Sequence, residues 1–117
     1  MDTIIGFSTA DKMTFAATLS VTADPTAAAA GSSVSQNSAG LVTFAAADNT
    51  LALKIAAVQA DLQLDAAGSV ALFTDGSNQY VYFAGAAIGN ADDQLIQLTG
   101  ITTLTTVNGG AGTITFA

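Results

Sequence analysis

The sequence of 117 residues predicts a mainly β domain, a β-sandwich or β-roll-like fold with about six to seven strands and one packed α-helix. Short β-branched and aromatic runs recur between turn residues, and one stretch has the apolar spacing of a helix. Alanine and threonine are abundant, which suits closely spaced layers that pack through small side chains. The length fits one domain that covers residues 1–117.

The N-terminal region predicts two short strands. Ile4 and Ile5 belong to the first strand, which ends at Gly6. Met13 and Phe15 alternate with a threonine in the second, and this two-residue period is typical of a half-buried strand.

Residues 22–40 form a low-complexity stretch in which Val34 is the only large apolar residue. Such a segment buries too little apolar surface to offset the entropy lost on ordering it. We therefore expect a flexible low-complexity loop over about residues 22–40, with at most one weak strand around Val34.

One helix is expected over about residues 49–62. Asp48 is the expected N-cap, because its carboxylate can accept a hydrogen bond from a backbone amide in the first turn. Steps of four, three and four residues place four apolar side chains on one face of this helix: Leu51, Ile55, Val58 and Leu62. We expect this face to supply core, and replacement of Ile55 by aspartate to unfold the domain.

The strongest hairpin signal covers residues 69–84, where two apolar runs flank a glycine-containing turn that opens with Asp75. Tyr80 and Tyr82 share one face of the second strand. Paired tyrosines on a sheet can stack on sugar rings, although tyrosine is more often a half-buried aromatic whose hydroxyl reaches water. Tyr80 and Tyr82 are therefore candidate ligand-binding residues.

Further short strands are expected elsewhere in the chain. Residues 41–44, 94–98 and 113–116 have the composition of strands, and residues 101–107 form a threonine-rich extended segment.

The charge pattern excludes several functions. All nine acidic residues are aspartate, Lys12 and Lys54 are the only cations, and the net charge is -7. Nucleic-acid binding and docking on anionic lipid both need clustered cations, so neither is expected. Membrane insertion is not expected, because no run of about 18 apolar residues occurs.

The chain has few of the side chains that commonly catalyse reactions. The chain has no histidine, cysteine or arginine, which excludes a serine–histidine triad, a thiol nucleophile and the common transition-metal sites. We therefore expect that this chain is not an enzyme.

Two groups of aspartates are candidate calcium ligands, because short carboxylates at turns bind hard cations. Asp2 and Asp11 lie near the N-terminus, and Asp92 and Asp93 lie in a later loop. The alternative is that these residues cap helices and build turns, as aspartate commonly does. Neither group matches an EF-hand loop, so calcium would occupy a peripheral site or one completed by preceding sequence.

Three segments, in this order, resemble a known family. They are DTIIGFSTADKMTF, GSVALFTDGSNQYVYF and DDQLIQLTGITTL. The first looks like the stretch that follows the last calcium-binding roll in RTX-type calcium-repeat proteins, which are bacterial exports such as serralysin-like proteases, adhesins and S-layer proteins. The second is similar to the strand-turn-strand of that family, and the third resembles its signature near the C-terminus.

The resemblance implies a non-catalytic C-terminal cap that closes a calcium-repeat solenoid and carries an uncleaved signal for type I secretion. The implied partners are the preceding repeat domain of the same parent chain and the type I secretion transporter. Calcium is the implied cofactor, and the implied location is extracellular or on the bacterial cell surface.

Two alternatives remain open. One is a self-assembling adhesin or S-layer module that works by self-association. The other is a carbohydrate-binding module that uses Tyr80 and Tyr82.

Overall fold

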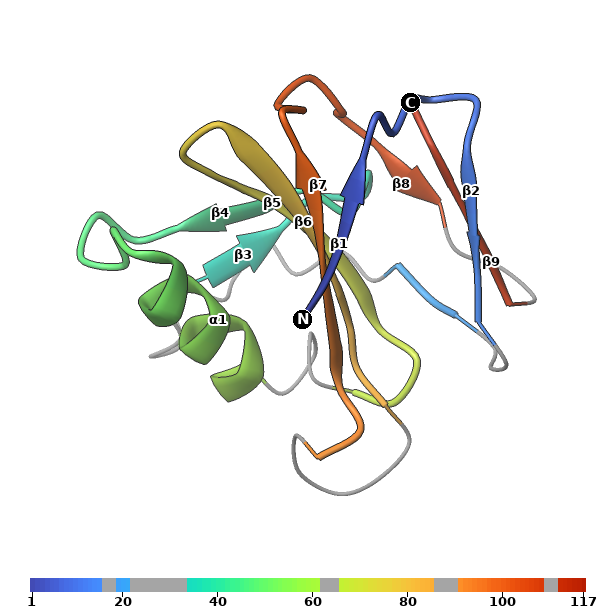
Figure 1. The fold of residues 1–117 in the computed structure, drawn as a ribbon. Helices are drawn as coiled ribbons and strands as arrows, with labels where there is room; N and C mark the ends of the chain where they lie inside the picture. The colour runs from blue at the N-terminus through green and yellow to red at the C-terminus, as the bar shows by residue number, and fades with distance from the viewer. Residues whose placement is uncertain (16–18, 22–33, 62–65, 86–90, 109–111) are drawn as a thin grey trace.

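The computed structural model describes residues 1–15, 19–21, 34–61, 66–85, 91–108 and 112–117. Within these residues the chain folds into nine strands in three sheets and one short helix. Figure 1 shows three layers, with the helix α1 and the hairpin β3–β4 on one side, a four-stranded sheet in the middle and a three-stranded sheet on the other side. The mainly β, sandwich-like fold expected from the sequence is confirmed.

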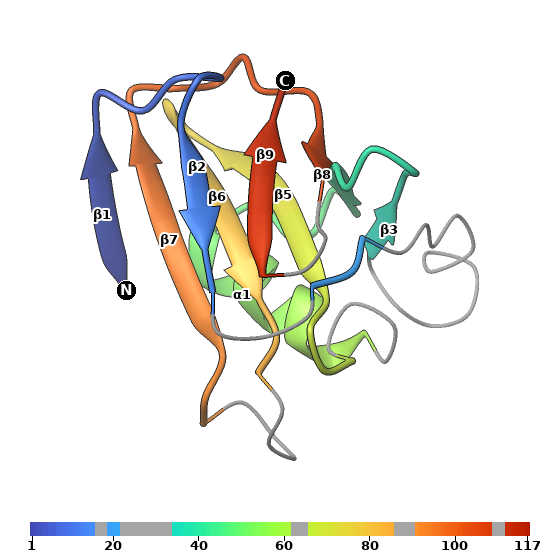
Figure 2. The ribbon, with the colours of Figure 1, turned by 90° about the vertical axis from the view of Figure 1, so that its right-hand side faces the viewer.

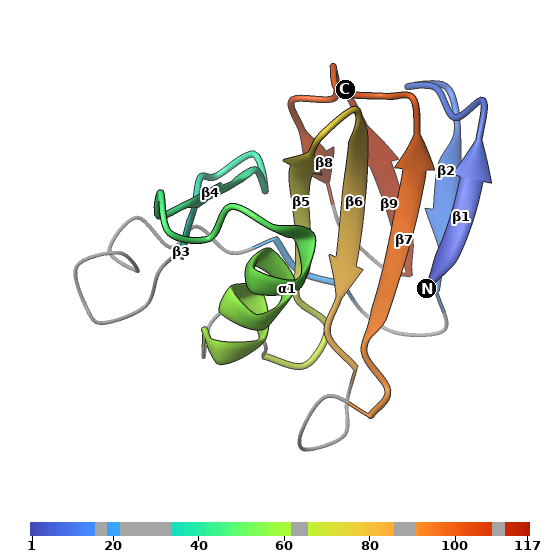
Figure 3. The ribbon, with the colours of Figure 1, turned by 60° about the vertical axis from the view of Figure 1, so that its left-hand side comes forward.

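The central layer, sheet A, has the strand order β1-β7-β6-β5 (Figure 3). Its strands are β1 (Asp2–Ile5), β5 (Val70–Asp75), β6 (Asn78–Phe83) and β7 (Gln94–Thr99). The predicted hairpin forms β5 and β6, which pair antiparallel from Val70 opposite Phe83 to Asp75 opposite Asn78. β1 is an edge strand that runs parallel to β7, whereas β6 pairs antiparallel with β7.

The second layer, sheet B, packs against one face of sheet A (Figure 2). Its strands are β2 (Lys12–Thr14), β8 (Val107–Asn108) and β9 (Thr113–Phe116), in the order β2-β9-β8. The inward residues Met13, Val107 and Ile114 join the core between the two sheets, whereas Lys12 and Thr115 on the outer face are exposed. Sheet B thus has the alternation of an antiparallel sheet with one solvated face.

The third layer covers the other face of sheet A and consists of α1 (Leu51–Ala60), β3 (Val34–Gln36) and β4 (Val42–Phe44). Val34, Val58, Phe73 and Tyr80 belong to this second core, among others. Sheet A is therefore buried on both faces, which explains why β5 and β6 read as nearly continuous apolar runs.

The expected N-cap of the helix was wrong. Thr50 is the N-cap, and its hydroxyl accepts a hydrogen bond from the backbone N–H of Leu53 at 3.3 Å. Asp48 lies in the preceding turn, where its own N–H donates to the carbonyl of Ala45 at 3.0 Å, so the helix begins after it.

The core face of the helix was predicted correctly where the structure describes it. Val58 is buried, and Leu51 and Ile55 pack against the same core, whereas Leu62 lies outside the described residues. α1 ends at Ala60, within the predicted range of 49–62.

The expected loop over residues 22–40 falls mostly outside the described residues, which resume at Val34. The weak strand expected around Val34 is present as β3, and Val34 is fully buried. None of the helical residues that the structure describes forms a segment long and apolar enough for a membrane crossing.

Candidate functional site

The outer edge of β1 is the main unpaired feature of sheet A. Among the described residues, β1 pairs only with β7, and Figure 2 shows it at the margin of the sheet. Its side chains are mostly exposed, and Ile5 is 81% exposed. An unpaired, apolar strand edge can accept a further strand.

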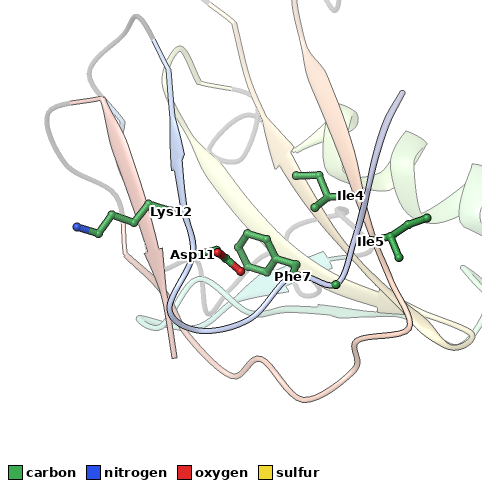
Figure 4. Close-up of a pocket in the computed structure, with 6 residues that line it drawn as sticks. Ile4, Ile5, Phe7, Asp11 and Lys12 are labelled. Carbon is green, nitrogen blue, oxygen red and sulfur yellow. The ribbon is translucent and has the colours of Figure 1, made fainter.

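A pocket of about 300 Å³ opens beside this edge, between β1 and β2 (Figure 4). Ile4 points into the space toward β2, whereas Ile5 points away from it. The ring of Phe7 is buried and meets the ring of Phe116 edge-on, with 4.9 Å between the ring centres. The pocket is thus the open side of the sandwich, where part of the core between sheets A and B reaches solvent.

The opposite edge of sheet A is covered by other parts of the chain. The N–H of Val70 donates to the carbonyl of Ser20 at 3.0 Å, and the N–H of Leu72 donates to the carbonyl of Gly40 at 2.9 Å. Gly40 has a φ of 81°, and a side chain there would collide with Val107. The sequence therefore closes the β5 side of the sandwich and leaves the β1 side open.

The two N-terminal calcium candidates, Asp2 and Asp11, lie in different environments. The Asp11 carboxylate accepts hydrogen bonds from the N–H and the hydroxyl of Ser8, at 2.7 and 3.0 Å. It therefore closes the turn between β1 and β2, as the turn-building alternative expects. Asp2 is an exposed residue of β1.

The second pair of candidates lies beside Gly85. The Asp93 carboxylate accepts from the hydroxyl of Tyr82 at 2.6 Å and from the N–H of Gly85 at 2.8 Å. The carboxylate of Asp92 packs over Gly85, and a side chain at position 85 would collide with it. Asp93 thus ties the start of β7 to the end of β6.

The two candidate sugar-binding tyrosines are buried in the core under α1. Tyr80 is 4% exposed and Tyr82 is 1% exposed. The ring of Tyr80 stacks on that of Phe73, with 5.5 Å between ring centres. Their ring faces are therefore covered by protein, and this geometry does not favour stacking on a sugar.

The half-buried cation Lys54 attaches the helix to sheet A. Its Nζ lies 2.9 Å from a carboxylate oxygen of Asp75 and donates to the carbonyl of Thr74 at 2.9 Å. The Nζ also lies 5.6 Å from the centre of the Phe44 ring, within the range of a cation–π contact.

Sequence reasoning missed buried polar residues of the core, among them Gln79. Its side-chain amide donates to the carbonyl of Leu104 at 2.8 Å and accepts from the N–H of Leu104 at 3.0 Å. The available signal was a glutamine directly before the apolar run of β6, since a buried amide needs partners for its polar atoms.

The described residues bring no more than two acidic side chains together at any point. No group of three or more acidic residues that could hold a metal ion occurs among them. Asp92 and Asp93 are neighbours in sequence, and Asp93 already binds Tyr82 and Gly85.

Comparison of the chain with protein-family models, with curated proteins and with solved structures finds no match. The functional proposals therefore depend on the residues and the geometry of this chain.

Proposed function

We propose that this chain is a non-catalytic structural domain of a secreted or cell-surface protein, acting as a terminal cap and as the export domain of a calcium-repeat protein. The observation that carries the proposal is the position of β9. This last strand of the sequence is the central strand of sheet B, with β2 on one side and β8 on the other. Sheet B therefore forms only after residues 113–116 are available.

Late formation of sheet B suits a protein that crosses membranes before it folds. Until β9 is in place, Met13 and Val107 lack the residues of β9 with which they pair, and the core between sheets A and B stays open. Export by type I secretion requires an unfolded chain, and sheet B cannot form before β9 is present, because β9 is the strand that pairs with both β2 and β8.

The residues that carry the family resemblance hold the fold together, which supports a structural role. Phe7 belongs to the core and Asp11 closes a turn. Asp93 ties β7 to β6, and Leu104 is bound by Gln79. Each of these four residues thus makes contacts within the domain.

The cap role is supported by the edge strand β1. It is the parallel member of sheet A, and its free edge offers backbone groups that a preceding parallel strand could bind. A solenoid needs a terminal unit that covers its last coil, and a sandwich with one open side fits that need.

Export is the test of this proposal. A reporter protein fused before residues 1–117 should appear in the culture medium of cells that express a type I secretion system, and should stay inside cells that lack the transporter. Retention of the reporter in both strains would contradict the export role.

A folding-defective fusion separates the export signal from the folded domain. Ile114→Asp places a carboxylate in the fully buried centre of β9 and should prevent folding. Because the transporter reads an unfolded chain, this fusion should still be exported, whereas a fusion that lacks residues 94–117 should not.

A self-assembling module is the second candidate function. It is favoured by one observation, the 81% exposure of Ile5 on the open edge of sheet A.

A further inference from the structure

We propose that two copies of this chain form a two-fold dimer by antiparallel pairing of their β1 strands. This inference rests on the second candidate function, self-association, and does not depend on export. It names the surface, the partner and the register of the contact.

The edge of β1 is the place where sheet A can grow. β5, at the other edge, is covered by Ser20 and Gly40, whereas no described strand pairs with the outer side of β1. Alternate residues of the four-residue strand β1 direct their backbone N–H and carbonyl groups away from β7, and Ile5 exposes most of its side chain.

The register follows from the faces of the strand. Ile4 faces the core between the sheets, and Thr3 and Ile5 face the other side of sheet A. Directly opposed residues of antiparallel strands share a face, so a two-fold pair can centre on residue 3, 4 or 5. Centring on Ile4 places Ile4 opposite Ile4 of the second copy and Thr3 opposite its Ile5, whereas the other two centres place Ile4 opposite Asp2 or Gly6. The opposed residues Thr3, Ile4 and Ile5 of the Ile4-centred register are all β-branched, which is the composition that cross-strand pairs favour.

The same register avoids a clash of charges, although each chain has a net charge of -7. It places Asp2 opposite Gly6 of the second copy, so the two Asp2 carboxylates lie at opposite ends of the seam. Gly6 has open space where a side chain would be, so it leaves room for the opposed aspartate. About four residues separate the two carboxylates along the seam, which is about 13 Å and beyond the screening length in physiological salt.

The dimer would also cover the open side of the sandwich. Sheet A of each copy has four strands, so the joined sheet would be continuous across both copies. The half-buried Ile4 and the pocket that it lines would face their equivalents across the two-fold axis. A preceding repeat strand and a second copy are alternative partners for this edge.

The first experiment measures the mass of the purified chain by light scattering and sedimentation over concentrations up to about 1 mM. The mass should rise from the 11.6 kDa of one chain toward twice that value. Ile5→Lys should weaken the dimer by about tenfold or more, because it removes two β-branched pairs and brings like charges together across the seam.

Leu53→Lys is the matched control. Leu53 is 45% exposed on α1, far from β1 in the fold, and this substitution changes the net charge by the same amount. It should leave the dimer unchanged, and circular dichroism should show that both variants keep the fold.

The second experiment tests the register. The chain contains no cysteine, so a single introduced thiol can react only with its copy. Ile4→Cys should form a covalent dimer under mild oxidation, because directly opposed Cα atoms lie about 4.5 to 5.5 Å apart. Ile5→Cys should not, because two copies of residue 5 would be more than about 7 Å apart.

Three results would overturn the proposal: a wild-type chain that stays monomeric at every concentration, equal dimerisation of Ile5→Lys and Leu53→Lys, or faster cross-linking at position 5 than at position 4. None of these measurements involves secretion, so their failure leaves the export proposal standing, and failed export leaves the dimer standing.

Discussion

Two buried glutamines bind backbone groups in the core of this domain. The amide of Gln36 donates to the carbonyl of Val70 at 3.2 Å, and Gln79 binds both backbone groups of Leu104. Leu104 lies in the irregular segment between β7 and β8, which has no strand partner at that point. The side chain of Gln79 thus replaces the ladder contacts that a neighbouring strand would supply.

Replacing Gln79 by methionine should lower the free energy of unfolding by about 2 to 4 kcal/mol. Methionine has a similar size, but it leaves the N–H and the carbonyl of Leu104 buried without partners. Urea unfolding measures this loss.

Gln97→Met is the control, because Gln97 is half-buried in β7 and its amide donates to the exchangeable hydroxyl of a nearby side chain, Thr99, at 3.2 Å. This change should cost about 0.5 kcal/mol or less. Equal losses for the two variants would show that the Leu104 contact adds nothing to stability.

The contacts of single polar side chains were the feature that the sequence predicted least. The hydrogen bond between Tyr82 and Asp93 joins β6 to the residue before β7, and nothing in the local pattern of either residue pairs them. The alternation of β6 placed both tyrosines on one face, but it could not show that α1 covers that face. Burial of a sheet face depends on a distant segment, which local periodicity does not report.

At the scale of elements, the helix depends on its contacts with sheet A. α1 is ten residues long, too short to be stable alone, so its stability comes from the face that packs on the sheet. Lys54 adds a polar attachment through Asp75 and Thr74.

Ile55→Asp should destabilise the domain by about 2 to 4 kcal/mol, a large share of the stability of a small domain. Ile55 packs against the core under α1, where a carboxylate would lose its hydration. Thermal unfolding followed by circular dichroism measures the shift.

Leu53→Asp provides the comparison on the same helix. Leu53 is exposed, so the same change of chemistry should cost about 1 kcal/mol or less. Equal melting temperatures for the Ile55→Asp and Leu53→Asp variants would show that the packing of α1 on sheet A does not stabilise the fold.

Elements with strong local signals were predicted well, whereas the contacts of a connection between layers could not be predicted from the sequence. The β5–β6 hairpin follows from its apolar runs and its turn, and α1 follows from the spacing of its apolar residues. Residues 101–107 were expected to form a threonine-rich extended segment, and of these residues only Val107 belongs to a strand, β8. This segment crosses from sheet A to sheet B, so its conformation is set by distant partners such as Gln79 and Ala117.

At the scale of the whole molecule, Ala117 binds the segment that connects sheet A to sheet B. The N–H groups of Thr105 and Thr106 donate to the carbonyl of Ala117, at 2.8 and 3.2 Å. β9 lies between β2 and β8, which are separated by more than ninety residues of sequence between Thr14 and Val107. Folding of sheet B is therefore controlled by long-range contacts, which form slowly.

Thr115→Pro tests this dependence on the central strand. Thr115 pairs with Lys12 on one side and with Asn108 on the other, and its own side chain is exposed. Proline removes a ladder N–H and cannot fit a central strand, so the variant should lose about 3 kcal/mol or more of unfolding free energy. Thr115→Val keeps the β-branched shape and the backbone N–H, and it should change stability by about 0.5 kcal/mol or less. Denaturant unfolding measures these stability changes. Hydrogen exchange of the folded variants then distinguishes two outcomes. If β9 holds the sandwich together, exchange in Thr115→Pro accelerates across sheet B and at the inward residues of sheet A together. Acceleration limited to the neighbours of residue 115 would mean that sheet A folds without sheet B, and that late arrival of the C-terminal strand does not delay folding of the domain.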